Sequence, residues 1–270
     1  GMIIEVKHTT TYNYSELLNR SQQILRLIPM TNSHQKVLNW KLSAPTLVHR
    51  YQDWYGNQCG FLEINKSDKL SHITIEAIGR VETNHSLMNE DVGCLPLDYL
   101  MVQTNFTQMS RQLIDFAADF YKQHYHLITS HNEYEFFALL SQTILKLVPY
   151  VKGVTQVDST AADSFRLQSG VCQDHAHLLL ALTRYFNIPA RYVSGYIYTE
   201  DTSHVESHAW AEVWYNNAWH SFDVSNQCQA GINHIGLACG SDYSSASPIR
   251  GSRVGGGLET LETFASVVIE

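Results

Sequence analysis

Cys172 is the residue of this 270-residue chain whose setting most favours nucleophilic chemistry. Gly170 is expected to interrupt the chain before a helix, so that Cys172 lies in the first turn, near unpaired N–H groups and the positive end of the helix dipole. That position favours the thiolate, which is the reactive form of cysteine. A buried cysteine alone is more often a packing residue than a nucleophile, so the assignment requires a base nearby.

The stretch from His208 to Asp223 supplies a histidine and a carboxylate. Small or apolar residues alternate with large or polar ones, which predicts two strands joined by a two-residue turn at Asn216 and Asn217. In that register Asp223 is opposite Trp210, on the same face as His208 and diagonal to it, roughly 7 Å away between backbones. The pattern therefore pairs a base with an orienting acid.

Three separated segments resemble the bacterial transglutaminase-like superfamily, whose fold is related to that of papain. They are Gly-Val-Cys-Gln-Asp at 170–174, Ile-Pro-Ala-Arg-Tyr-Val-Ser-Gly-Tyr at 188–196, and Ser-His-Ala-Trp-Ala-Glu-Val at 207–213, followed by Phe-Asp at 222–223. The resemblance implies a nucleophile, base and orienting acid at Cys172, His208 and Asp223. The chain departs from the usual family pattern directly after the aspartate, where Val and Ser stand in place of Pro and Thr.

The first third of the chain predicts strands, with apolar residues alternating around 38–42 and 73–77. Its motifs resemble the N-terminal region that precedes this family's core. We therefore predict an α+β protein with a β-sandwich-like domain over 2–84, a connection over 85–105 and a papain-like, transglutaminase-like catalytic domain over 106–270. In the last of these, a helix bearing the cysteine would pack on an antiparallel sheet.

Composition excludes several classes of protein. The net charge is -8 and basic residues do not cluster, which argues against nucleic acid or an anionic membrane surface as a partner. No apolar run reaches the roughly 18 residues of a membrane-spanning helix, and the first residues alternate instead of forming a signal peptide, so we expect a cytoplasmic protein. Five cysteines without C-x-x-C pairs argue against disulfides and zinc ribbons. We expect structural roles for Cys59, Cys94, Cys228 and Cys239.

A metal site at Cys172, His175 and His177 is a competing interpretation, because both residue types bind zinc. Positions i and i+2 of a helix point to different faces, so the two histidines should not converge. We therefore expect no metal and no cofactor. A non-catalytic interaction module is the other alternative, although all three members of the expected triad are present.

The expected chemistry is acyl transfer through a thioester on Cys172, with a peptide or protein substrate. His208 would accept the thiol proton, Asp223 would orient the ring, and the Cys172 backbone N–H would stabilise the oxyanion; a second donor is not identifiable from sequence. If water accepts the acyl group, the protein is a cysteine peptidase or amidase, which is the prediction we favour. A glutamine substrate leaves deamidase or transglutaminase activity as alternatives.

Overall fold

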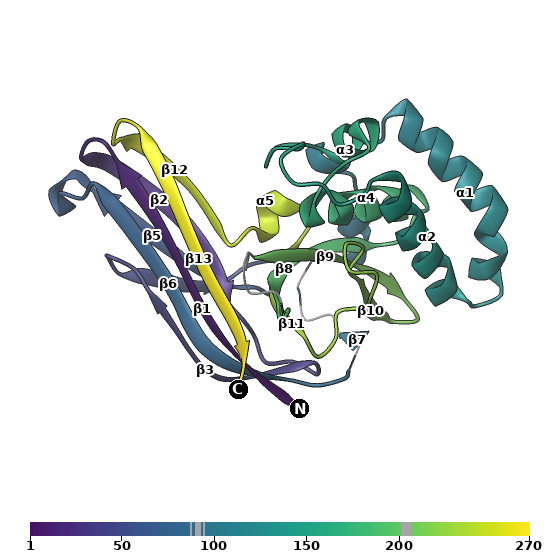
Figure 1. The fold of residues 1–270 in the computed structure, drawn as a ribbon, viewed down its shortest axis with the longest axis horizontal. Helices are drawn as coiled ribbons and strands as arrows, with labels where there is room; N and C mark the ends of the chain where they lie inside the picture. Colours follow the sequence, from purple (N-terminus) through teal and green to yellow (C-terminus); the bar gives the residue numbers. More distant parts are fainter. Residues whose placement is uncertain (87, 90–92, 94, 201–206) are drawn as a thin grey trace.

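The computed structural model describes residues 1–86, 88–89, 93, 95–200 and 207–270. Figure 1 shows a β-sandwich beside a smaller sheet that carries helices on one face. The predicted α+β class is confirmed. Cys94 falls outside the described residues. No helix of the described chain combines the length and apolar character needed to cross a bilayer.

The sandwich consists of two antiparallel sheets of four strands. One contains, in spatial order, β13 (Glu259–Ile269), β1 (Met2–Tyr14), β6 (His72–Thr83) and β3 (Gln35–Ser43). The other contains β12 (Ile249–Gly255), β2 (Leu18–Ile28), β5 (Gln58–Asn65) and β4 (Val48–Gln52). Alternating burial along β6 shows one face turned to the core, as its sequence predicts.

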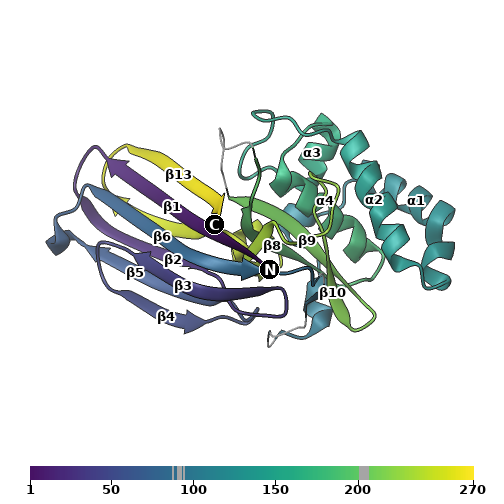
Figure 2. The same cartoon turned by 60° about the horizontal axis from the view of Figure 1, so that its bottom comes forward.

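The sandwich is completed by two strands that follow Cys172, His208 and Asp223 in the chain. β13 pairs with β1 from Ile4 opposite Ile269 to Tyr14 opposite Glu259, and β12 pairs with β2. Figure 2 shows β13 alongside β1, with both chain ends nearby. The sequence placed these strands within the 106–270 domain, whereas their hydrogen bonds are made with the sandwich.

The second part of the molecule is a five-stranded sheet covered by helices. Its strands, in spatial order, are β11 (His234–Gly240), β8 (Ala190–Ile197), β9 (His208–Tyr215), β10 (Ala218–Phe222) and β7 (Met88–Asn89). The helices are α1 (Arg111–Thr129), α2 (Glu133–Leu147), α3 (Ala161–Leu167), α4 (Cys172–Tyr185) and the short α5 (Tyr243–Ala246). Short 3-10 turns occur at Lys66–Asp68, Leu97–Met101 and Asn105–Thr107.

Helix α4 is the centre of this second core. Its residues from Asp174 to Arg184 are all buried, and it packs on the apolar face of β9. Burying a leucine side chain contributes roughly 1.5–3 kcal/mol, and the run Leu178–Leu182 lies in this helix. The core therefore fixes the position of the helix start, where Cys172 lies.

The opposite face of the five-stranded sheet packs against the sandwich. Tyr196, Ile235 and Leu237 belong to the same buried cluster as the sandwich residues. The hydroxyl of Tyr196 also lies 2.7 Å from Nδ1 of His8 in β1. The strand β11, at the edge of the sheet, is thereby held between the two parts of the molecule.

Candidate active site

Cys172 is the first residue of α4, as the sequence predicts, and its side chain is partly buried. The helix start is held by Asp174, whose Oδ2 accepts hydrogen bonds from the Val171 backbone N–H (2.9 Å) and the Thr155 hydroxyl (2.7 Å). Gly170 leaves the room that this carboxylate needs, because a Cβ there would lie 2.7 Å from the Asp174 side chain. The backbone N–H of Cys172 has no hydrogen-bond acceptor within the helix, because the N–H groups of a first helical turn lack preceding carbonyl groups in the helix.

His208 and Asp223 are brought together by the hairpin of β9 and β10. Tyr215 lies opposite Ala218, and Asn216 and Asn217 adopt positive φ angles of 50° and 59°, as a tight primed turn requires. His208 Nε2 and Asp223 Oδ2 are 2.7 Å apart. The predicted register and the predicted contact between the two side chains are both confirmed.

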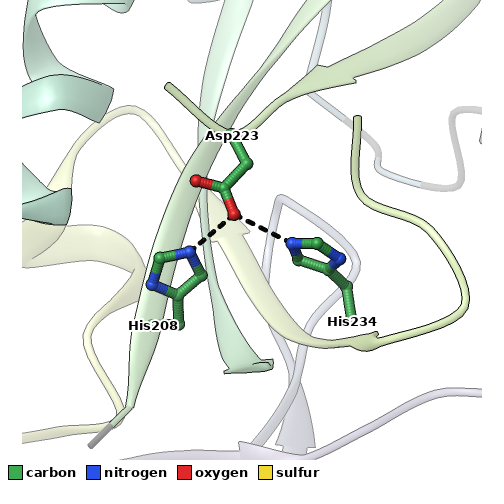
Figure 3. A group of neighbouring side chains, drawn as sticks. All are labelled: His208, Asp223 and His234. Carbon is green, nitrogen blue, oxygen red and sulfur yellow. Dashed lines mark hydrogen bonds and ion pairs between the residues drawn. The ribbon is translucent and has the colours of Figure 1, made fainter. Parts of the chain in front are cut away.

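The Cys172 thiol lies close enough to the His208 side chain to act, with Asp223, on the pKa of the ring. Since Nε2 of the ring faces Asp223, Nδ1 is the nitrogen left for the sulfur, and Figure 3 shows it pointing away from the carboxylate. Burial lowers the pKa of His208, but the hydrogen bonds and charges of Asp223 and Cys172 outweigh burial and raise that pKa to about 10. The arrangement therefore favours the imidazolium form of His208 at neutral pH.

Asp223 is fully buried, and its carboxylate accepts several hydrogen bonds. Oδ2 accepts from His208, from His234 Nε2 at 2.9 Å and from Asn226 Nδ2 at 2.9 Å, while Oδ1 accepts from the Asn226 backbone N–H at 3.2 Å. Burial acts to raise the pKa of Asp223, but the hydrogen bonds from His208 and His234 hold it well below its usual range. The acid is therefore ionised at neutral pH.

His234 was not identified from the sequence. It begins β11, eleven residues after Asp223, and reaches the carboxylate (Figure 3) because the loop between them folds back, with Cys228 bridged to Asp223. No local spacing rule predicts such a return.

His208, Asp223 and His234 are also residue types that bind metal ions, and their ligand atoms lie within 4.8 Å of one another. The two Nε2 atoms, however, are at hydrogen-bond distance from one carboxylate oxygen, which gives each ring proton an acceptor. The hydrogen bonds account for this cluster without an ion.

The neighbouring histidines of α4 face different partners. His175 lies between the Val148 carbonyl oxygen and the Ser225 hydroxyl, both at 2.7 Å. His177 accepts a hydrogen bond from the Tyr243 backbone N–H at 3.1 Å and stacks on Phe106. Burial lowers the pKa of both rings, that of His177 to about 3, so both are neutral core residues at neutral pH.

Comparison with known proteins identifies the family. A model of the transglutaminase-like superfamily matches residues 126–224, and a model of the bacterial transglutaminase-like N-terminal region matches residues 4–82. The chain belongs to the transglutaminase-like superfamily. The core match contains Cys172, His208 and Asp223, as the resemblance of the sequence motifs implied.

Relatives of this transglutaminase-like chain extend over nearly its whole length. An uncharacterized protein of Mycobacterium leprae is 25% identical over 98% of both chains. One from Mycobacterium tuberculosis strain H37Rv is 24% identical over 91% of this chain and 86% of its own. The crystal structure of a candidate cysteine protease from Cytophaga hutchinsonii has a TM-score of 0.77 at 19% identity, covering 99% of this chain and 90% of its own, and it shares the fold.

The two family matches end at residues 82 and 224, so the transglutaminase-like core match stops one residue after Asp223. His234 and the strands β11, β12 and β13 lie beyond both matches. The part of the site contributed by His234 must therefore be understood from the structure of this chain.

Of the other cysteines that the sequence assigned to structural roles, Cys59 is buried, Cys239 is partly buried and Cys228 is exposed. Cys228 also forms an isolated backbone bridge with Asp223. Burial raises the pKa of the Cys59 thiol to about 11, and partial loss of solvent around the Cys228 sulfur, together with the charge of Asp223, raises the pKa of that thiol to about 11 as well. Neither thiol shares the histidine contact made by Cys172.

Proposed function

We propose that this protein catalyses thiol-dependent acyl transfer on peptide or glutamine-type amides, with hydrolysis as the reaction. The main support for this proposal is a series of contacts, in which the Cys172 thiol lies next to the His208 side chain and His208 Nε2 lies 2.7 Å from Asp223 Oδ2. A nucleophile, a base and an orienting acid joined in this order are the groups that acyl transfer requires.

In the first half of the reaction, the Cys172 sulfur adds to the amide carbonyl carbon and the carbonyl electron pair moves to oxygen. The Cys172 backbone N–H, free at the helix start, is the donor we assign to that oxyanion. The imidazolium of His208 then gives its proton to the departing nitrogen as the C–N bond breaks. An amine leaves and a thioester remains.

In the second half, neutral His208 takes a proton from water as the water oxygen attacks the thioester. Collapse of that intermediate breaks the C–S bond and releases a carboxylic acid and the thiolate. The buried negative charge of Asp223 supports the imidazolium each time it forms. We favour water over an amine because water is the abundant acceptor, and the sequence contains no motif that predicts an amine site.

The test uses a glutamine-containing peptide incubated with and without a primary amine, with products identified by mass. We expect free acid in both cases. An amine adduct as the main product would instead indicate a transglutaminase, and an intact peptide would favour an interaction module. The peptide substrate and the cytoplasmic location stay predictions from the sequence.

Matched cysteine variants assign the thiol in this test. Cys172→Ala should lower turnover by at least about a thousandfold and leave the melting temperature nearly unchanged, because one small side chain replaces another. Cys228→Ala, which removes the exposed thiol, should keep full activity. Turnover that survives in Cys172→Ala would contradict the assignment of the nucleophile.

A further inference from the structure

We propose that His234 is a positioning residue that holds Asp223 against His208, and that the N-terminal sandwich keeps His234 in place through strand β11. This inference rests on the proposed function, since it concerns the same triad. It gives the sandwich a part in catalysis that neither the sequence nor the family matches assign.

The first argument is the geometry at Asp223. One carboxylate oxygen, Oδ2, faces two imidazole rings, with Nε2 of His208 at 2.7 Å and Nε2 of His234 at 2.9 Å (Figure 3). His234 comes from a different strand than His208, so the two donors approach the oxygen from separate parts of the sheet. A carboxylate held by two rings cannot rotate away from His208 without breaking its buried hydrogen bond to His234.

The second argument is the protonation of His234. Its Nδ1 accepts a hydrogen bond from the Gly231 backbone N–H at 3.1 Å, so the ring proton is on Nε2, where it is donated to Asp223. Burial lowers the pKa of this ring, which keeps it neutral. A neutral donor holds the carboxylate without cancelling the negative charge that supports the His208 imidazolium. Trp210 packs edge-on against the ring, with centroids 5.1 Å apart.

The third argument is the attachment of β11 to the sandwich. β11 is an edge strand of the five-stranded sheet, and its open edge is occupied by two side-chain amides instead of another strand. Gln35 donates to the Gly236 carbonyl oxygen and accepts from the Gly236 N–H, both at 2.9 Å. Asn57 makes the same double contact with Cys239 at 2.7 and 2.8 Å.

A third sandwich residue reaches His234 itself. Nε2 of His34 lies 2.9 Å from the His234 backbone oxygen, at the start of β11. The position of the His234 ring is thus set from the sandwich side by His34 and Gln35, and from the catalytic side by Asp223. This arrangement connects the N-terminal part of the chain to the triad through one strand.

The test compares His234→Gln, whose side-chain amide can still donate to Asp223, with His234→Leu, which cannot. We expect His234→Leu to lower kcat at least tenfold with KM within about twofold, and His234→Gln to recover most of that loss. His220→Leu is the matched control: it removes another buried histidine of the same sheet, one that donates to the Tyr215 carbonyl oxygen and not to the triad. Equal kcat values for wild type and His234→Leu, or equal losses in the Gln and Leu variants, would overturn the proposal.

A second measurement needs no substrate, and so separates this inference from the proposed reaction. Iodoacetamide labelling of the Cys172 peptide is followed by mass spectrometry at one pH. We expect wild type and His234→Gln to label at similar rates and His234→Leu to label at least fivefold more slowly, because an Asp223 that is no longer held by His234 does not keep the His208 ring in place beside the sulfur. An unchanged labelling rate in His234→Leu would overturn the inference even if the wild-type protein hydrolyses amides.

The contribution of the sandwich is tested with Gln35→Met, which keeps the length of the side chain and removes both hydrogen bonds to Gly236. We expect kcat to fall at least threefold with KM within about twofold, while His234 is still present. If Gln35→Met has the same kcat as wild type, the proposal that the sandwich holds His234 in place is refuted, although His234 itself can still position Asp223.

Discussion

Replacing Asp223 by Asn tests whether the carboxylate charge sets the state of His208. In the native protein Oδ2 accepts N–H groups from His208, His234 and Asn226, and Oδ1 accepts the Asn226 backbone N–H. An asparagine amide has only one oxygen, so at least one N–H would face the new NH2 group. The change removes the charge and leaves the site with an unsatisfied buried donor.

The size of the effect follows from the pKa of His208. Burial lowers that pKa, and the Asp223 and Cys172 interactions that outweigh burial raise it to about 10. Without the carboxylate, we expect the pKa to return to its ordinary 6.5 or lower. At pH 8 the imidazolium fraction would then fall from nearly complete to about 3%, a loss of roughly thirtyfold, before any loss of ring orientation. With misorientation included, kcat/KM should fall about a hundredfold or more.

The pH dependence makes the prediction specific. At pH 6 a ring of pKa 6.5 is still about three-quarters protonated, so the charge loss alone costs little there. The ratio of wild-type to Asp223→Asn activity should therefore rise steeply from pH 6 to pH 9, measured as peptide hydrolysis with thiol labelling in parallel. A ratio that is flat with pH, or full activity of the variant at pH 8, would refute the reasoning.

Two further predictions concern stability. On folding, burial lowers the pKa of His208 but Asp223 and Cys172 outweigh it and raise that pKa from 6.5 to about 10. The stability that His208 contributes is therefore complete below pH 6.5 and is lost as the pH rises through about 10. Burial acts to raise the pKa of Asp223, but His208 and His234 lower it, so the stability that Asp223 contributes is complete above about pH 4 and is lost on acidification. Urea unfolding from pH 3 to pH 10 should show this dependence in wild type and a weaker one in Asp223→Asn. Breaking the buried ion pair of Arg191 and Glu212, with Nε to Oε1 at 2.7 Å, should cost about 3–5 kcal/mol in Glu212→Ala. The exposed pair of Arg111 and Asp115 is the control, since Asp115→Ala should cost under about 1 kcal/mol, and equal costs for the two variants would contradict the argument.

The site elements that were predicted from the sequence are those encoded by local pattern. Strand alternation and the pair Asn216 and Asn217 determine the hairpin register, and that register alone places Asp223 beside His208. The break at Gly170 and the apolar spacing after it predict the start of α4 at Cys172. In each case the residues that carry the information lie within one element or one turn.

The features that the sequence did not predict depend on contacts between segments that are far apart in the chain. His234 begins a strand whose position is fixed by β8 and by sandwich side chains about two hundred residues earlier, such as Gln35. Likewise, the sequence of β13 says nothing of its partner, which is β1. A hydrophobic pattern defines which face of a strand is buried, and it does not define which strand lies next to it.

The order of the strands bears on how the protein is assembled during synthesis. Each sheet of the sandwich has one edge strand, β12 or β13, that follows the whole five-stranded sheet and its helices in the chain. Pairing β1 with β13 closes a loop of more than two hundred residues, and such distant contacts form slowly. A ribosome-bound chain that has already exposed Cys172 still lacks both late strands. Cys172 therefore emerges before the sandwich that anchors β11 is complete, so the order of the chain itself delays full assembly of the candidate active site on the nascent protein.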